Sequence, residues 1–157
     1  MISMEIYTVG YFFYKRAFMN ELLTLDDFPF HFEMNTRWRD LDAFGHVNNA
    51  IFATYVEDAR VSMFERWNLS QTAGSRSVIA ASLKLNFKRQ LSHPSEIIIG
   101  QRISRIGSTS FDIQAVIYKK DIPNRPICET LLTCVCFNYD EQKSVEVYSE
   151  IVRDFTP

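Results

Sequence analysis

Several features are scarce or missing in this sequence of 157 residues. It has only three cysteines, Cys128, Cys134 and Cys136, an odd number without the spacing of a disulfide scaffold. Reduced thiols and a cytoplasmic location are therefore predicted. Cys134 and Cys136 alternate along an apolar run, so we expect both on one sheet face as small core residues. No second Cys/His pair completes a tetrahedral set, so the sequence predicts no bound metal.

Long apolar runs and a strong net charge are also missing. No apolar segment approaches the length of a membrane helix, so no membrane partner is predicted. The net charge of −2 and the pI near 5.9 give no global attraction to nucleic acid. There is no glycine-rich phosphate loop, Rossmann fingerprint or G-x-S-x-G motif, which disfavours nucleotide hydrolysis, dinucleotide redox chemistry and serine hydrolase chemistry.

A secretory signal is not predicted at the N-terminus. Its apolar part is short, is interrupted by Gly10, and is followed rather than preceded by Lys15 and Arg16. We interpret residues 1–29 as an N-terminal extension and residues 30–157 as a single domain. The size and the hydrophobic content of 46% suffice for a real core.

The hydrophobic pattern gives the order of the elements. Residues 30–38 alternate apolar and polar side chains, as in a half-buried strand. Residues 48–67 contain no Gly or Pro and carry apolar residues at spacings of three and four, which predicts a helix with Asn48 or Asn49 as its cap. Four extended segments follow at 78–89, 96–106, 108–120 and 125–140, separated by His93-Pro94, by Gly107 and by a turn at 121–126. Residues 143–155 are predicted to form a short terminal helix.

This order predicts an α+β fold. One helix followed by consecutive strands favours an antiparallel sheet with the helix laid across it. Alternation along residues 82–88 indicates that one face of that sheet is solvated. A single sheet leaves edge strands open, and pairing them in a dimer closes them.

The stretch RDLDAFGHVNNA, residues 39–50, lies directly before the predicted helix. Unpaired N–H groups in a first helical turn can hold an oxyanion, and a nearby carboxylate can attack a carbonyl or deprotonate water. Asp before a helix is more often a cap, and His46 is more often structural. Spacing alone therefore favours the structural interpretation.

The pattern R-x-x-D-x-D-x-x-G-H-V-N-N followed by Y-x-E-x-A-R resembles the hotdog-fold thioesterases, in particular the 4-hydroxybenzoyl-CoA thioesterase-like branch. The matching residues are Arg37, Asp40, Asp42, Gly45, His46, Val47, Asn48, Asn49, Tyr55, Glu57, Ala59 and Arg60. The resemblance extends from about residue 30 to residue 155. It implies a long helix wrapped by an antiparallel sheet, and active sites at the interface of a homodimer or homotetramer.

The resemblance also implies hydrolysis of an acyl-CoA thioester, without a cofactor beyond the CoA of the substrate. Asp42 would attack the carbonyl or activate water, and the backbone N–H of Asn49 would stabilise the oxyanion. His46 and Asn48 would shape the loop, with Gly45 giving access beside Val47. Glu57 is the reserve catalytic candidate, although an ion pair with Arg60 is the structural alternative. Asp40 is assigned a structural role.

Binding of CoA phosphates is expected from basic residues on adjoining predicted strands. They are Lys84, Lys88, Arg89, Arg102 and Arg105. Solvated strand faces look the same, so these residues also have a purely structural interpretation. Two further functions stay open: a thioesterase for acyl carrier protein, and a non-catalytic acyl-CoA-binding protein.

Overall fold

The computed structural model describes residues 23–69 and 74–155. The sheet contains strands β1 (Phe30–Asn35), β2 (Ser77–Phe87), β3 (Glu96–Ile106), β4 (Ser110–Lys119), β5 (Ile122–Asn138) and β6 (Lys143–Ser144). Its order is β1-β3-β4-β5-β2, with β6 paired to β5, and all the pairs are antiparallel. Strands β1 and β2 therefore form the two edges.

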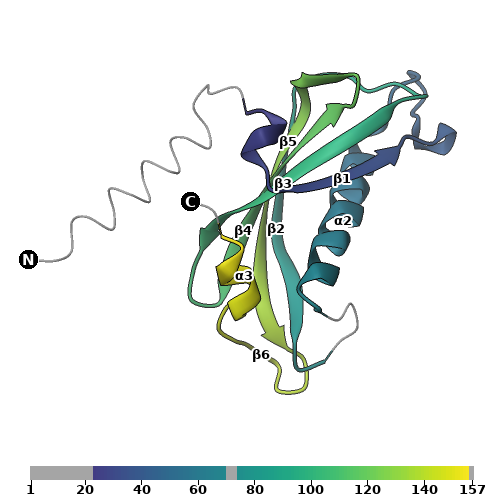
Figure 1. Cartoon of the computed structure of the whole chain (residues 1–157). Helices are drawn as coiled ribbons and strands as arrows, with labels where there is room; N and C mark the ends of the chain where they lie inside the picture. The colour runs from purple at the N-terminus through teal and green to yellow at the C-terminus, as the bar shows by residue number, and fades with distance from the viewer. Residues whose placement is uncertain (1–22, 70–73, 156–157) are drawn as a thin grey trace, which may run out of the picture.

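The sheet curls around one long helix, α2 (Asn49–Arg66), as Figure 1 shows. A short helix, α3 (Ser149–Arg153), and two 3₁₀ turns, η1 (Leu25–Asp27) and η2 (Trp38–Asp40), complete the described part. This is the predicted α+β arrangement, and the hotdog fold implied by the resemblance is confirmed. No helix within residues 23–69 and 74–155 is both long enough and apolar enough to cross a bilayer.

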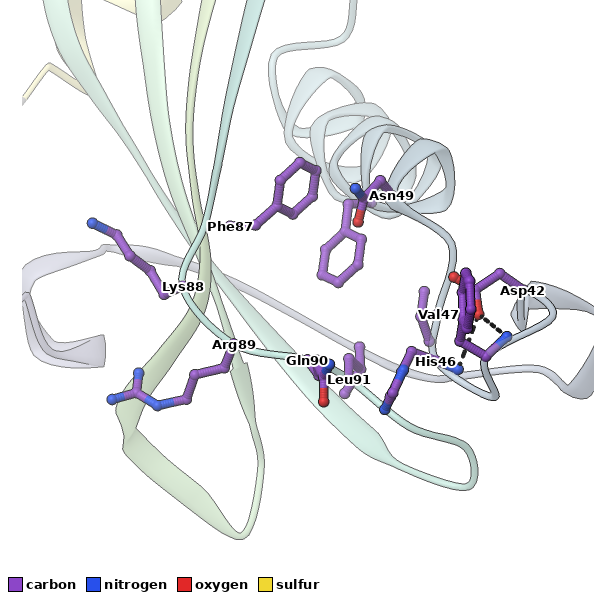
Figure 2. Close-up of a pocket in the computed structure, with 11 residues that line it drawn as sticks. Asp42, His46, Val47, Asn49, Phe87, Lys88, Arg89, Gln90 and Leu91 are labelled. Atoms are coloured by element: carbon purple, nitrogen blue, oxygen red, sulfur yellow. Dashed lines mark hydrogen bonds between the residues drawn. The ribbon is translucent and has the colours of Figure 1, made fainter.

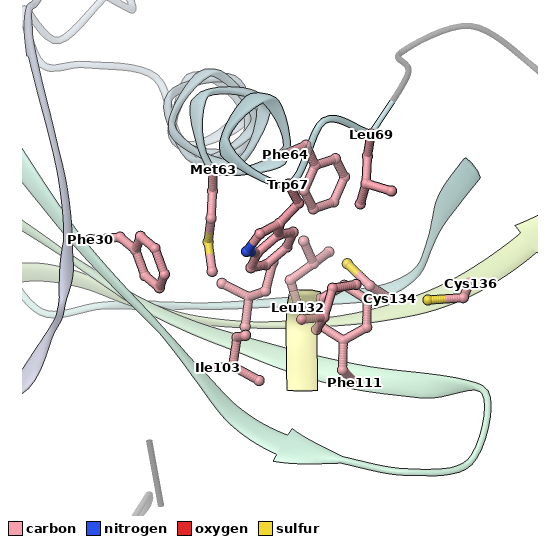
Figure 3. Packing of buried hydrophobic residues seen from close by; sticks show 12 residues of the cluster. Phe30, Met63, Phe64, Trp67, Leu69, Ile103, Phe111, Leu132, Cys134 and Cys136 are labelled. Atoms are coloured by element: carbon pink, nitrogen blue, oxygen red, sulfur yellow. The ribbon is translucent and has the colours of Figure 1, made fainter. Parts of the chain in front are cut away.

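The core fills the space between α2 and the sheet. Near the helix C-terminus, Trp67 packs edge-on against Phe30 and Phe111 (Figure 3). Its indole Nε1–H donates to Asp154 Oδ2 over 2.7 Å. Cys134 and Cys136 are buried in the same cluster, which confirms that they share a face. Burial raises the pKa of the Cys128 and Cys134 thiols to about 12. The three thiols therefore act as small apolar residues.

The opposite face of the sheet is covered by the segment just before β1. Phe28 packs there on Ile98, Val116 and Tyr118, residues that alternate with those facing α2. A Cβ at Gly100 would lie 2.9 Å from the Cβ of Phe28, so a glycine is needed under this ring. Residues 23–29 of the predicted extension thus pack on the domain, and residues 1–22 lie outside the described part.

Three boundaries differ from the prediction. The first strand ends at Asn35 rather than residue 38, because Asp40 Oδ2 accepts the N–H of Arg37 over 2.8 Å and draws the chain into η2. The predicted turn at 121–126 belongs mostly to β5, since Ile122 already faces Lys119 across the hairpin. The C-terminal helix begins only at Ser149, because Val145 and Val147 pack extended against the core.

Candidate active site

A cavity of about 520 Å³ lies where the first turn of α2 faces the end of β2 (Figure 2). Its first wall is the loop before α2 with the first helical turn, and its second wall is the segment from Phe87 to Leu91. The lining residues are Asp42, Phe44, His46, Val47, Asn49, Phe52, Phe87, Lys88, Arg89, Gln90 and Leu91. The fold thus joins residues some 40 positions apart in the chain around the motif region.

Asp42 holds the loop before α2 in shape. Its Oδ1 accepts the backbone N–H of Phe44 over 2.8 Å and that of His46 over 3.3 Å. Its own N–H donates to the carbonyl of His46 over 2.8 Å. The tight turn places Gly45 at φ +77°, a conformation that favours glycine. Within the described part of the chain, Oδ2 of Asp42 accepts no hydrogen bond, so one carboxylate oxygen stays available at the cavity.

The start of α2 follows the predicted cap. The Asn48 side chain accepts the N–H of Ala50 over 2.9 Å, and its carbonyl accepts the N–H of Ile51 over the same distance. The N–H of Asn48 donates to the carbonyl of Asp40 over 2.9 Å. Among residues 23–69 and 74–155 no acceptor is found for the N–H of Asn49, and Asn49 lines the cavity. An unpaired donor at a helix N-terminus can bind an oxyanion.

Asp40 anchors the chain just before this loop, which is the structural role that the sequence predicts. It is 1% exposed and accepts the N–H of Arg37, the Nε–H of Arg37 and the Tyr55 hydroxyl, the last over 2.6 Å. Burial alone would raise the pKa of the Asp40 carboxyl, but hydrogen bonds from Tyr55 and Arg37 together lower this pKa below its ordinary value. Burial, with Asp40 as hydrogen-bond partner, raises the pKa of Tyr55. Asp40 is thus an ionised anchor.

The five predicted basic residues do not lie together. Lys84, on β2, is outside the cavity lining. Lys88 and Arg89 lie at the cavity rim, with side chains that point away from Asp42 (Figure 2). Lys88 Nζ lies 3.0 Å from Glu129 Oε2, and Arg89 Nη1 donates to the Pro126 carbonyl over 2.6 Å. The expectation that Arg102 and Arg105 share this rim is wrong.

Arg102 and Arg105 belong to β3, which two further strands separate from β2. Arg102 donates to Gln114 on β4 and lies over the Phe28 ring. Arg105 is paired with Asp112, also on β4.

Glu57, Gly45 and Asn48 do not line the cavity. The Glu57 side chain is 61% exposed and forms the local ion pair with Arg60 that its spacing allows, at 3.0 Å. Gly45 and Asn48 act through the backbone turn and the helix cap. Among the predicted residues, Asp42, His46, Val47, Asn49, Lys88 and Arg89 meet at one cavity.

Sequence reasoning missed most of the apolar wall. Phe52 lies in the predicted helical stripe and Phe87 in the predicted strand, but their meeting depends on how the sheet curls. Phe44 is 85% exposed and lies inside the motif. An apolar residue in this otherwise polar turn could have indicated a position that lines the cavity. Helical and strand periodicity show which face a residue occupies, not which distant residue it meets.

The arrangement combines a carboxylate, a free backbone donor and an apolar wall. Asp42 and Asn49 both line this cavity. Such a pair suits nucleophilic or water-mediated attack on a carbonyl carbon. Within the described residues, no three or more His, Cys, Asp or Glu side chains are placed to hold a metal ion.

Comparisons with known proteins show similarity to a thioesterase and to an uncharacterized protein. The long-chain acyl-CoA thioesterase FadM of Escherichia coli K12 is 23% identical over 121 residues, which cover 76% of this chain and 91% of FadM. The uncharacterized protein YsmA of Bacillus subtilis 168 is 29% identical over 86 residues, 55% of this chain and 58% of YsmA. The chain thus spans somewhat over half of the length of YsmA.

A solved structure extends the match to three dimensions. A thioesterase from Thermus thermophilus, complexed with coenzyme A and Zn, superimposes with a TM-score of 0.68 at 25% identity, covering 81% of this chain and 97% of that one. Residues 36–155 match the profile of the thioesterase-like superfamily, a span that includes the whole cavity. The chain belongs to the thioesterase-like superfamily.

Proposed function

We propose that this chain hydrolyses acyl-CoA thioesters to the free acid and CoA. The observation that carries the proposal is that Asp42 and Asn49 line one cavity. Among the described residues, one carboxylate oxygen of Asp42 and the backbone N–H of Asn49 have no hydrogen-bond partner. FadM and the CoA-bound thioesterase support the choice of acyl-CoA as substrate. No cofactor beyond the CoA of the substrate enters this reaction.

In the proposed reaction the thioester carbonyl oxygen accepts the Asn49 N–H. Either Asp42 attacks the carbonyl carbon, expels CoA thiolate and leaves a mixed anhydride that water hydrolyses, or Asp42 removes a proton from a water that attacks directly. Both routes yield the acid and a thiolate that takes up a proton. One oxyanion donor is worth about 3–4 kcal/mol to such a transition state. His46 fixes the loop through the backbone hydrogen bonds that it exchanges with Asp42.

Replacing Asp42 by Asn tests the assignment. Release of free thiol is measured over a panel of acyl-CoA esters for the unsubstituted chain, Asp42→Asn and the control Asp121→Asn. Asp121 is exposed in the β4–β5 hairpin turn and does not line the cavity. We expect kcat to fall by about 10²–10⁴-fold in Asp42→Asn, because the amide keeps the size but loses the anion. Unchanged turnover in Asp42→Asn contradicts the role of Asp42.

The two routes differ in where the oxygen of water first appears. In a single turnover in ¹⁸O-labelled water, a nucleophilic Asp42 acquires the label in its carboxylate when water attacks the Asp42 carbonyl of the anhydride. A general base transfers no labelled oxygen to Asp42. Label found by mass spectrometry in the peptide that contains Asp42 therefore establishes the nucleophilic route.

CoA recognition is proposed for Lys88 and Arg89 at the rim. A phosphate would compete there with Glu129 for Lys88 and with the Pro126 carbonyl for Arg89. Replacing both residues by Gln should raise KM for acyl-CoA and leave kcat within about threefold, since they are remote from the carbonyl. An acyl carrier protein substrate, run in parallel, shows which carrier is preferred. Faster turnover of the carrier-protein ester would redirect the proposal to that substrate.

We also propose that the protein forms a homodimer, or a homotetramer built from dimers, in the cytoplasm. Strand β2 is 11 residues long, pairs only with β5 among the strands of residues 23–69 and 74–155, and exposes Leu83 at 41%. A long edge strand without proline is a template for pairing with a second copy.

The free, buried thiols of the described chain support the proposed location in the cytoplasm, which is a reducing compartment. Cell fractionation tests this location, and recovery of the protein outside the soluble cytoplasmic fraction contradicts it.

A further inference from the structure

Two aromatic rings from distant parts of the chain meet at the wall of the cavity. Phe52 lies in the first turns of α2, and Phe87 is the last residue of β2. Their ring centroids lie 5.3 Å apart with planes at 78°, an edge-to-face contact. Both residues line the cavity, and Figure 2 labels Phe87 in its wall. The pair therefore forms an apolar contact between its two walls.

Helix geometry places this pair beside the proposed reaction centre. Phe52 follows Asn49 by three residues, so the two lie on the same face of α2. A carbonyl oxygen held by the Asn49 N–H has its acyl group within reach of the Phe52 ring. The Lys88 and Arg89 side chains point away from the cavity (Figure 2). The acyl group, rather than the charged part of CoA, is thus the portion of a thioester that suits the aromatic pair.

The two rings are held very differently. Phe52 is 2% exposed and also contacts Tyr55, with ring centroids 6.2 Å apart. Phe87 is 41% exposed and ends β2, which in the described part of the chain pairs only with β5. One ring is therefore fixed in the core, while the other stands between cavity and surface. A change at Phe87 alters the size of the cavity at less structural cost than a change at Phe52.

We propose that Phe87 determines which acyl groups the site accepts. Its ring closes the cavity on the β2 side against Phe52 and so limits the length of the acyl chain. This inference rests on the proposed hydrolysis of acyl-CoA. A shorter side chain at position 87 opens the cavity toward the surface, and each additional methylene that becomes buried is worth about fourfold in binding.

The test compares acyl-CoA esters from butyryl to palmitoyl. The variants are Phe87→Ala, Phe87→Leu as the milder truncation, and Phe87→Trp as the enlargement. Phe137→Ala is the matched control, because Phe137 forms a similar edge-to-face pair with Tyr139, at 5.1 Å and 74°, away from the cavity. Thermal unfolding of each variant shows that it is folded before its kcat/KM values are compared.

We expect Phe87→Ala to raise the ratio of kcat/KM for palmitoyl-CoA over butyryl-CoA by about tenfold or more. Phe87→Leu should shift the ratio in the same direction by less, Phe87→Trp should lower it, and Phe137→Ala should leave it unchanged. Active Phe87 variants with an unaltered ratio overturn the inference and leave the proposed function standing. Absence of turnover by the unsubstituted chain on every ester overturns both. If Phe87→Ala does not fold, the Leu and Trp variants decide.

Discussion

Asp40 and Asp42 lie two residues apart and have identical side chains, yet their surroundings give them different roles. Asp40 is buried and has both oxygens engaged by Arg37, with Tyr55 as a further donor. Asp42 lies half-exposed at the cavity and uses one oxygen to hold the loop. A carboxylate whose oxygens are both engaged anchors structure, whereas one with an oxygen left over can react.

Tyr55→Phe should lower the unfolding free energy at neutral pH by about 1.5–3 kcal/mol, the range for hydrogen bonds to charged groups. The reason is that Phe keeps the packing but removes the hydroxyl that donates to Asp40. Urea unfolding monitored by circular dichroism gives the difference.

This difference should depend on pH with a definite sign. The pKa of Asp40 is lower in the folded chain than the ordinary 3.8, so its stabilisation is complete above that value and is lost as pH falls through the folded pKa. The gap between the unsubstituted chain and Tyr55→Phe should therefore be constant from pH 7 to 5 and narrow below about pH 4. A gap that widens as the pH falls contradicts the assignment.

At the scale of single elements, the N-terminus of α2 depends on one side chain. Asn48→Ala removes the acceptor for the Ala50 N–H and should cost about 0.5–2 kcal/mol of unfolding free energy. Asn48→Asp keeps an acceptor and places a negative charge at the helix N-terminus, so it should retain the stability. Equal destabilisation by both substitutions would show that the cap is not the cause.

The elements themselves could largely be predicted from the sequence. The stripe from residue 48 to residue 67 and the cap at Asn48 correspond to α2, and residues 96–106 form β3 as expected. Local period and capping chemistry determine these features, so a single sequence contains them. The turn at 121–126 was misplaced, because Pro123 and Pro126 can sit in a part of β5 that pairs only with β4.

The candidate site could be predicted only on its helical side. The motif places Asp42, His46 and Asn49 together because they are local in the chain. The partners on the second wall, Phe87 to Leu91, come from the curl of the sheet, which no local pattern encodes. Arg102 and Arg105 illustrate the same limit, since neighbours in sequence order need not be neighbours in the sheet.

At the scale of the whole molecule, the open edge of β2 predicts self-association. Sedimentation velocity across a concentration series should give the mass of at least a dimer for the unsubstituted chain. Leu83→Glu places a charge on the exposed edge strand and should shift the population toward monomer. Val152→Glu is the control, because Val152 is 49% exposed on α3, outside the sheet.

Two outcomes contradict the proposed dimer. One is a monomer mass for the unsubstituted chain at every concentration. The other is equal association of Leu83→Glu and the unsubstituted chain, which would move the interface away from β2.

The burial of Trp67 among Phe30, Phe64 and Phe111 also gives the protein an optical consequence. The other tryptophan, Trp38, is 79% exposed in η2, just before the loop that carries Asp42. The fluorescence emission of the protein should therefore have two components. Buried Trp67 gives a blue-shifted component, and exposed Trp38 gives a red-shifted component that acrylamide quenches. In Trp38→Phe, the remaining signal reports unfolding of the core alone. In Trp67→Phe, the remaining indole is a natural fluorescent probe beside the proposed active site.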